Sequence, residues 1–249
     1  GSAQQLIWQS YYLMEETFKY ETPRVMVFNV LSMKYDTPAS TGAASQREAY
    51  NRMTIDPMRW SMSKWNCIQA SMTDMEREKE AQWMYLFPLL RYHDRWSDLK
   101  AEDFQYWFKR GDIADNGYLM QTGIKPVTNA HVEKPLVDYS FAPNCWEWLD
   151  KMRQLCEEHG TELVLIKAPS LSPVWWDQWD AQIEEYAEKH DLVYWNFLDY
   201  QEEIGIDWNT DTYDTGLHLN VYGAEKMSSY FGQLLVDTFD LPDRRSDEA

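Results

Sequence analysis

Hydrophobic positions in the first and last thirds of this chain alternate between strand-like runs and helical spacing. Short, nearly continuous apolar runs occupy residues 24–31 (RVMVFNVL), 162–167 (ELVLIK) and 192–197. Runs of this length are typical of strands buried on both faces of a parallel sheet. Around them apolar residues recur every three to four positions, which predicts helices. We expect these helices at 5–20, 144–159, 176–190 and 222–236.

This order of elements predicts the fold class. Helices and strands that alternate with short connections form a doubly wound parallel α/β sheet. Gly160 directly follows the helix predicted at 144–159 and is expected to cap its carboxyl end. Ligands of such sheets bind beyond the carboxyl ends of the strands. Functional residues are therefore expected in the loops that follow the strands.

The pattern changes over about residues 34–140. A loop rich in Thr, Ala and Ser comes first, and a polar, irregular stretch at 111–139 comes last. We predict a single α/β domain over 1–249, in which 34–140 is a largely helical insertion. Its helices, with many Trp and Met residues, are expected at 47–53, 61–72, 75–90 and 101–109.

Charge excludes some partners. The formal net charge of −18 would repel the phosphate backbone of nucleic acids and an anionic membrane surface, so neither is an expected partner. The chain contains no run of eighteen apolar residues, so the sequence predicts no membrane span. The chain begins at Gly1 without Met, so the lack of a signal peptide does not indicate a compartment.

The three cysteines are predicted to be buried thiols. Cys145 and Cys156 fall on one predicted helix about 16 Å apart, beyond disulfide reach, and Cys67 has no evident partner. No CxxC motif or Cys/His cluster has the spacing of a zinc site. We expect no metal and no other cofactor.

Candidate chemistry lies in the loop before the final predicted helix. This loop holds Asp214, Gly216 and His218. A carboxylate beside a histidine fixes the imidazole tautomer, so that the ring can act as a general base. Alternatively, Asp214 is a turn former and His218 a surface residue. The position of the loop after the last predicted strand favours the general base.

The string around this pair resembles a family motif. DxxxHLNxxGxxK resembles the last conserved block of the SGNH (GDSL-type) hydrolases, in which an Asp and a His act with a serine nucleophile. The usual spacing puts two residues between acid and base, whereas Asp214 stands three residues before His218. Gly216 is flexible enough to absorb the extra residue, and Asp211 is the alternative acid. The matching residues are Asp214, His218, Leu219, Asn220, Gly223, Ala224 and Lys226.

The resemblance extends over about residues 1–35 and 144–236. The segments PRVMVFNV, HGTELVLIKAPS and NFLDYQEEIGID are similar to central strands of one SGNH branch. Its members are extracytoplasmic, anchored bacterial proteins that accompany membrane-bound O-acyltransferases in alginate acetylation and teichoic-acid D-alanylation. The resemblance implies a flavodoxin-like three-layer sandwich and a place in the cell envelope. It also implies a polysaccharide or acyl-donor substrate, an O-acyltransferase partner, and an anchor upstream of Gly1.

The serine block of the family, GDS or GSS after the first strand, is not recognisable. The first five residues, GSAQQ, have three interpretations. They are a cloning remnant, or Ser2 is the nucleophile, or they belong to the second block, whose Gly1 gives an oxyanion-hole N–H. We favour the last interpretation, which puts the serine upstream of this chain. Ser170 is a weaker candidate, because a serine at a strand end more often satisfies a turn.

The resulting functional hypothesis is an SGNH-type serine esterase or O-acyltransferase. The alternative is a non-catalytic polysaccharide-binding or assembly module on the same scaffold. His93 and Arg95 in RYHDRW, and Arg52, are candidates to bind substrate carboxylates or hydroxyls. The alternative for the RYHDRW cations is a helix end that neutralises its own dipole.

Tryptophans and asparagines offer further candidates. Trp175, Trp176 and Trp179 could stack on sugar rings, although large aromatic residues mostly fill cores. Asn29 is predicted to lie in mid-strand, where it could not serve as an oxyanion donor. Asn220 is expected to cap the final helix.

Overall fold

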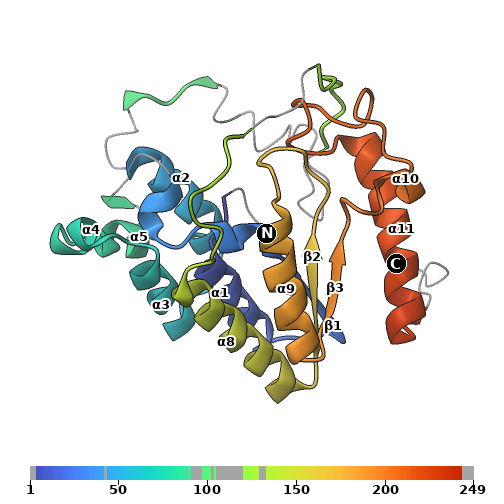
Figure 1. Cartoon of the computed structure of the whole chain (residues 1–249). Helices are drawn as coiled ribbons and strands as arrows, with labels where there is room; N and C mark the ends of the chain where they lie inside the picture. The colour runs from blue at the N-terminus through green and yellow to red at the C-terminus, as the bar shows by residue number, and fades with distance from the viewer. Residues whose placement is uncertain are drawn as a thin grey trace. The chain divides into compact units, whose positions relative to one another are not determined.

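The computed structural model of the chain describes residues 4–41, 44–87, 89–90, 97–101, 104, 120–128 and 133–242. Within these residues the protein is mixed α/β, with many helices and a three-stranded parallel sheet in which β1, β2 and β3 lie side by side (Figure 1). The strands are β1 (Val25–Asn29), β2 (Glu162–Lys167) and β3 (Val193–Asn196). The prediction of an α/β protein with parallel strands is thereby confirmed.

Burial differs between the strands. β1 pairs with β2 in a register that runs from Val25 opposite Glu162 to Asn29 opposite Ile166. The centre of β2 is fully buried, as its apolar run predicts. β1 lies at the edge of the sheet in the described part of the chain, and Val27 is 39% exposed. Burial of β1 on both faces was therefore a wrong prediction, because a continuous apolar run does not distinguish a central strand from an edge strand.

The chain divides into two compact units. Unit 1 comprises Gly1–Asp103, Asp138–Ile166 and Ala181–Trp195. Unit 2 comprises Phe104–Val137, Lys167–Asp180 and Asn196–Ala249. The predicted insertion at 34–140 therefore contributes residues to both units.

Three helices form the main packing of unit 1. They are α1 (Ile7–Thr17), α3 (Met62–Ala70) and α8 (Pro143–His159), and α1 contacts both of the others. Helix α8 begins with Pro143 in its first turn and ends at Gly160, which has φ 65°. Gly160 thus caps α8 in the left-handed conformation, as predicted. The fully buried side chains on these helices include Ile7, Cys67, Ile68, Leu149 and Met152.

The rest of unit 1 is built from short helices. They are α2 (Ala44–Ile55), α4 (Asp74–Glu78) and α5 (Gln82–Leu86), with 3-10 helices at Val30–Lys34 and Pro38–Thr41. A single helix over 75–90 was a wrong prediction. Glu80 lies between α4 and α5 with φ 54°, a conformation that ends a helix. Most of the helix predicted at 101–109 lies outside the described residues.

Unit 2 contains α10 (Gln201–Ile204) and the long final helix α11 (Val221–Phe239), and α9 (Asp177–Lys189) begins in it. Asn220 caps α11 as predicted, because its Oδ1 accepts hydrogen bonds from the backbone N–H groups of Tyr222 and Gly223. The Phe231 ring of α11 packs edge-on against Phe197, with 5.3 Å between ring centroids.

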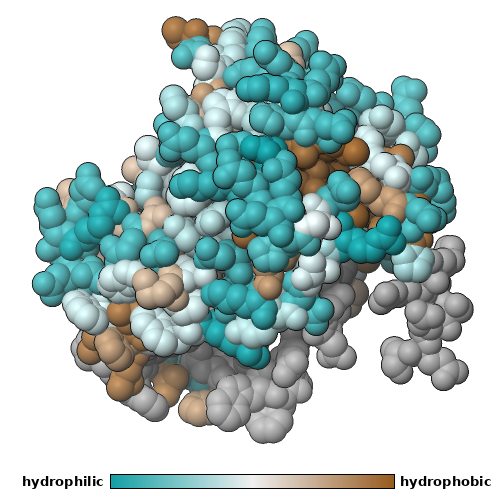
Figure 2. Space-filling model, turned by 90° about the horizontal axis from the view of Figure 1, so that it is seen from below, coloured by the Kyte–Doolittle hydropathy of each residue, from teal (hydrophilic) through white to brown (hydrophobic). Residues whose placement is uncertain are grey.

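The cysteines are free and buried, as predicted. Burial raises the pKa of Cys67 and of Cys156 to about 12, so both are protonated and unreactive at neutral pH. Among the described residues, no helix is long and apolar enough to cross a membrane. The face in Figure 2 is largely hydrophilic, with smaller apolar patches, in keeping with the 41 Asp and Glu residues.

Gly223→Ala is expected to lower the free energy of unfolding by roughly 1–3 kcal/mol, because overpacking at a rigid contact has this cost. A Cβ at Gly223 would lie 2.7 Å from the backbone oxygen of Asp211. Gly232→Ala in the same helix is the matched control. Nothing lies within 4 Å of its Cβ, so it is expected to stabilise the protein by about 0.5–1 kcal/mol through helix propensity. Urea unfolding of both variants measures the difference, and equal effects would contradict this packing.

Candidate active site

Asp214 and His218 lie on a loop that is closed at its base by backbone hydrogen bonds. Thr212 and Leu219 form an antiparallel bridge, and the N–H of Asn220 donates to the oxygen of Asp211 at 2.9 Å. The fully buried Thr212 hydroxyl donates to the His218 carbonyl at 2.8 Å and accepts from the Gly216 N–H at 2.8 Å. These bonds hold the loop in one compact turn.

The tip of the loop has an unusual backbone. Thr215 has φ 62° and Gly216 has φ 91°. A Cβ at Gly216 would meet Val127 Cγ2 at 3.0 Å and Leu171 Cβ at 3.2 Å, so the position requires glycine for its space as well as for its conformation. These two left-handed residues turn the chain so that an acid and a histidine four positions apart meet.

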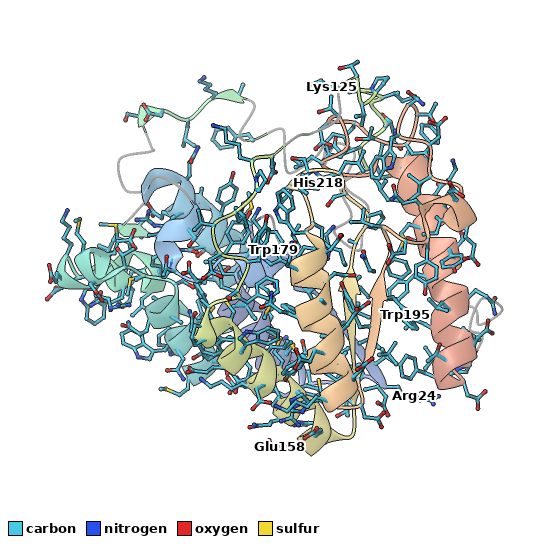
Figure 3. All side chains as sticks on the ribbon, viewed as in Figure 1. Arg24, Lys125, Glu158, Trp179, Trp195 and His218 are labelled. Atoms are coloured by element: carbon cyan, nitrogen blue, oxygen red, sulfur yellow. The ribbon has the colours of Figure 1, made fainter. Side chains whose placement is uncertain are left out.

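One carboxylate holds His218 in two ways. Asp214 Oδ2 lies 2.6 Å from His218 Nδ1, and Asp214 Oδ1 accepts from the His218 backbone N–H at 2.7 Å. Since a carboxylate only accepts hydrogen bonds, Nδ1 carries a proton, and in the neutral imidazole the lone pair is therefore on Nε2. Figure 3 shows His218 on this loop. Its side chain is 60% exposed, and Nε2 has no hydrogen-bond partner among the described residues. The imidazole is thus oriented and open to accept a proton.

Tyr213 restrains one face of the imidazole. Its ring is nearly parallel to that of His218, at 10°, with 5.8 Å between the centroids. Burial and the charge of Asp214 raise the pKa of the Tyr213 hydroxyl. Tyr213 therefore stays neutral near physiological pH and acts here as a packing surface.

Two other segments of unit 2 hold the loop. The N–H of Lys125 donates to the Thr212 oxygen at 2.9 Å, and the N–H of Thr215 donates to the Lys125 oxygen at 3.1 Å. The N–H of Leu171 donates to the Gly216 oxygen at 2.7 Å. The roles of Lys125 and Leu171 were not predictable from their residue types, since these hydrogen bonds involve only backbone atoms. For Thr212 a turn signal was present, because a hydroxyl two residues before Asp214 can bond to the local backbone.

Asp211, the alternative acid, has a different position. It is 2% exposed, and its Oδ2 accepts from the Asp207 N–H at 2.8 Å and from Lys226 Nζ at 2.7 Å. Burial by itself would raise the pKa of Asp211, but these hydrogen bonds and the Lys226 charge lower it below its ordinary value. Asp211 anchors the base of the loop, and Asp214 is the acid that contacts the imidazole.

Ser170 is placed as a turn residue. It is 7% exposed, and its hydroxyl oxygen accepts a hydrogen bond from Lys167 Nζ at 3.0 Å. In the described part of the chain, no serine hydroxyl is hydrogen-bonded to His218. The described residues therefore include no serine nucleophile in contact with His218.

Among the residues proposed for the oxyanion hole and for substrate binding, the structure describes Arg52 alone. Gly1, His93 and Arg95 lie outside the described residues. Arg52 is 7% exposed within unit 1, where it bonds to Glu48 and to the Met84 oxygen and covers the Tyr85 ring. These contacts give Arg52 a packing role.

The tryptophan candidates are not exposed. Trp175 and Trp179 are each 8% exposed, and Trp176 is partly buried. Trp175 Nε1 donates to Asp180 at 2.8 Å, which satisfies its one donor. Core filling is therefore the interpretation that the structure favours for these three residues.

Asn29 is the last residue of β1, so its predicted position in mid-strand was wrong. The strand ends there because a 3-10 helix begins at Val30. The Asn29 side chain caps this helix by accepting from the Leu31 N–H at 3.2 Å. The side-chain oxygen of Asn29 is therefore engaged in a local capping bond.

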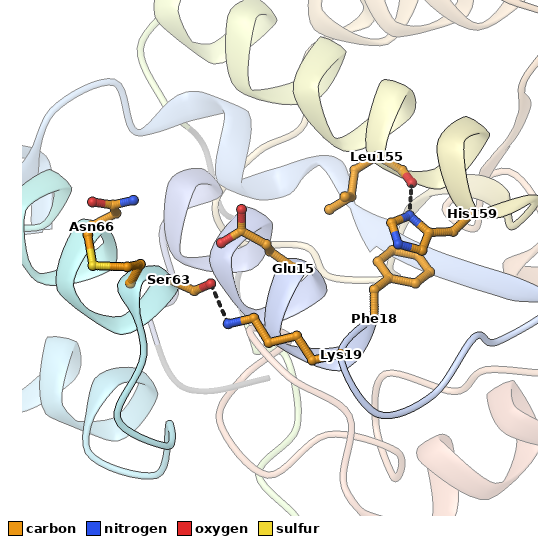
Figure 4. Close-up of a pocket in the computed structure, with 8 residues that line it drawn as sticks. Glu15, Phe18, Lys19, Ser63, Asn66, Leu155 and His159 are labelled. Atoms are coloured by element: carbon orange, nitrogen blue, oxygen red, sulfur yellow. Dashed lines mark hydrogen bonds between the residues drawn. The ribbon is translucent and has the colours of Figure 1, made fainter.

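Unit 1 has a hollow of about 350 Å³ between α1, α3 and α8 (Figure 4). Lys19 Nζ donates to Ser63 Oγ at 2.7 Å, and His159 Nδ1 pairs with the Leu155 oxygen at 2.8 Å. The Phe18 and His159 rings stack at 4.2 Å. Its one serine, Ser63, bonds to an ammonium rather than to a base, so the hollow offers no activated nucleophile.

Gly216→Ala is expected to lower the free energy of unfolding by roughly 2–4 kcal/mol, through backbone strain and steric contact together. Gly205→Ala is the matched control, since Gly205 has φ 76° but nothing within 4 Å of its Cβ. It should show only the backbone cost of about 1–2 kcal/mol. Chemical denaturation compares the two, and an equal loss would mean that Val127 and Leu171 do not confine the loop.

Asp211 should contribute to acid sensitivity. Its folded-state pKa is lowered, so its stabilisation is complete above the ordinary Asp value of about 4 and is lost as the pH falls through the folded-state pKa. Asp211→Asn is expected to flatten the decline of unfolding free energy below about pH 4. Denaturant titrations at several acid pH values test this, and an unchanged slope would show that Asp211 is not stabilised as an anion.

A comparison with protein-family models, with curated proteins and with solved structures finds no match to this chain. Within the described residues, no group of three His, Cys, Asp or Glu side chains could hold a metal ion. Functional inference therefore starts from the oriented pair Asp214 and His218.

Proposed function

We propose that this chain belongs to an SGNH-type serine esterase or O-acyltransferase that acts on acetyl-like groups of a cell-surface or secreted polysaccharide. One observation carries the proposal: Asp214 Oδ2 lies 2.6 Å from His218 Nδ1, while Nε2 is left without a partner among the described residues. This is the arrangement that a general base for a hydroxyl nucleophile requires.

The roles of the pair follow from this geometry. His218 Nε2 takes the proton of a serine hydroxyl as the oxygen attacks the acyl carbonyl, and Asp214 stabilises the imidazolium that forms. The imidazolium returns the proton to the departing alcohol, which leaves an acyl-serine. In the second step water or a sugar hydroxyl attacks this ester while His218 takes its proton, and the imidazolium then returns a proton to the departing serine oxygen, which restores the serine hydroxyl. The side chains suffice for this chemistry, so no cofactor is needed.

In this proposal the serine is upstream of Gly1, and the Gly1 N–H belongs to the oxyanion hole. Support comes from β1, which is an edge strand in the described part of the chain and exposes Val27. A further parallel strand that ends in the serine would cover this edge. Its addition would extend the small sheet toward the doubly wound, three-layer SGNH fold.

The cellular setting rests on the family resemblance. We propose an extracytoplasmic location with an anchor upstream of this chain, beside a membrane-bound O-acyltransferase. The net charge of −18 argues against nucleic acid as a partner.

A second candidate is a non-catalytic polysaccharide-binding or assembly module. It is favoured by exposed aromatic residues of unit 1, since Trp60 is 69% and Trp83 is 44% exposed. Exposed indole faces are suited to stack on the apolar faces of sugar rings.

The test uses a protein in which native upstream residues precede this chain. His218→Ala is expected to lower kcat for p-nitrophenyl acetate by about 10⁴-fold or more, and Asp214→Asn by up to about 10⁴-fold. His159→Ala, an exposed histidine of unit 1, is the matched control and should keep full activity. Unchanged turnover in His218→Ala would refute the esterase proposal. Glycan binding without turnover that depends on His218 would favour the second candidate.

A further inference from the structure

Lys167, the last residue of β2, is fully buried. A buried ammonium is costly unless its protons are hydrogen-bonded. Lys167 Nζ donates to the Ala168 oxygen at 2.6 Å and to Ser170 Oγ at 3.0 Å. It also lies 5.7 Å from the centroid of the Trp175 ring, within the range of a cation–π contact. The Lys167 ammonium thus contacts Ala168, Ser170 and Trp175, which all follow β2 in the chain.

These residues abut the loop of the candidate base. Leu171, next to Ser170, donates its N–H to the Gly216 oxygen at 2.7 Å. The Leu171 side chain occupies the space that a side chain at Gly216 would need, with Cβ and Cδ1 at 3.2 and 3.3 Å from an added Cβ. Gly216 lies between Asp214 and His218 in the chain. Leu171 therefore restrains the Gly216 peptide, whose conformation brings the two side chains into contact.

We propose that Lys167 is a positioning residue for the base: through Ser170 and Leu171 it holds the Gly216 peptide and thereby keeps Asp214 against His218. This inference rests on the proposed role of His218 as a general base. Gly216 has φ 91°, and rotation of its peptide would separate the carboxylate from the ring. Holding the Gly216 oxygen prevents that rotation.

A direct role for Lys167 in activating Ser170 does not fit the contacts. An ammonium that donates a hydrogen bond to Ser170 Oγ cannot take the proton of that hydroxyl. Ser170 is also buried, at 7% exposure, so a substrate would not reach it. The Lys167 and Ser170 contact therefore orders the turn.

The test is made on the 249-residue chain, without substrate. Lys167→Met keeps a long apolar side chain and removes the charge. We expect at least about tenfold faster amide hydrogen exchange at Leu171. We also expect loss of the hydrogen-bonded Nδ1–H signal of His218 in the imidazole NMR spectrum. Lys134→Met is the matched control, because Lys134 is an exposed lysine of the same unit, and it should leave Leu171 exchange unchanged.

Ser170→Ala is a milder variant that removes only one acceptor of the ammonium, and it serves if Lys167→Met does not fold. It should speed Leu171 exchange in the same direction. Wild-type exchange at Leu171 and a wild-type His218 signal in every folded variant would overturn the proposal.

Kinetics separates positioning from binding. In the protein with native upstream residues, Lys167→Met should lower kcat by about 10- to 100-fold with KM nearly unchanged, as expected when a base is misplaced by about 1 Å. An unchanged kcat would overturn the positioning role. If turnover proves independent of His218, the proposed function fails. The exchange experiment still decides whether Lys167 holds the Asp214 and His218 pair.

Discussion

One backbone hydrogen bond, from the Leu171 N–H to the Gly216 oxygen, connects the segment after β2 to the loop that presents His218. The loop itself is short and mostly polar, it exposes Leu217 and His218, and its left-handed Thr215 is costly. Its conformation persists because buried neighbours determine it. Thr212 bonds to its interior, Leu171 fills the space beside Gly216, and Lys167 holds the turn from which Leu171 projects.

Elements with a strong local signal were predictable from the sequence. The run ELVLIK is a strand with the predicted bounds, Gly160 ends its helix in the left-handed conformation, and Asn220 caps the last helix. The pairing of Asp214 with His218 was also predictable as a motif. For the strand and the two caps, neighbouring residues determine the conformation, whereas the Asp214 and His218 pair also depends on the distant Leu171 and Lys167.

Features set by distant contacts were not predictable. The pattern of RVMVFNVL does not distinguish an edge strand from a central one. Residues 75–90 likewise contain no signal that predicts the left-handed Glu80, which divides the helix. Lys125 and Leu171 donate backbone hydrogen bonds to the loop, which any residue type except proline could supply. Arg52 and the tryptophans had plausible chemistry, but their burial follows from tertiary packing.

The central claim is that Asp214 holds His218 in the tautomer of a general base. Imidazole ¹⁵N NMR of the 249-residue chain near neutral pH tests this most directly. The geometry predicts that the neutral His218 ring carries its proton on Nδ1, hydrogen-bonded to Asp214, and its lone pair on Nε2, and that Asp214→Asn abolishes this preference. A His218 ring with its proton on Nε2, or one that exchanges freely between tautomers, would contradict the claim.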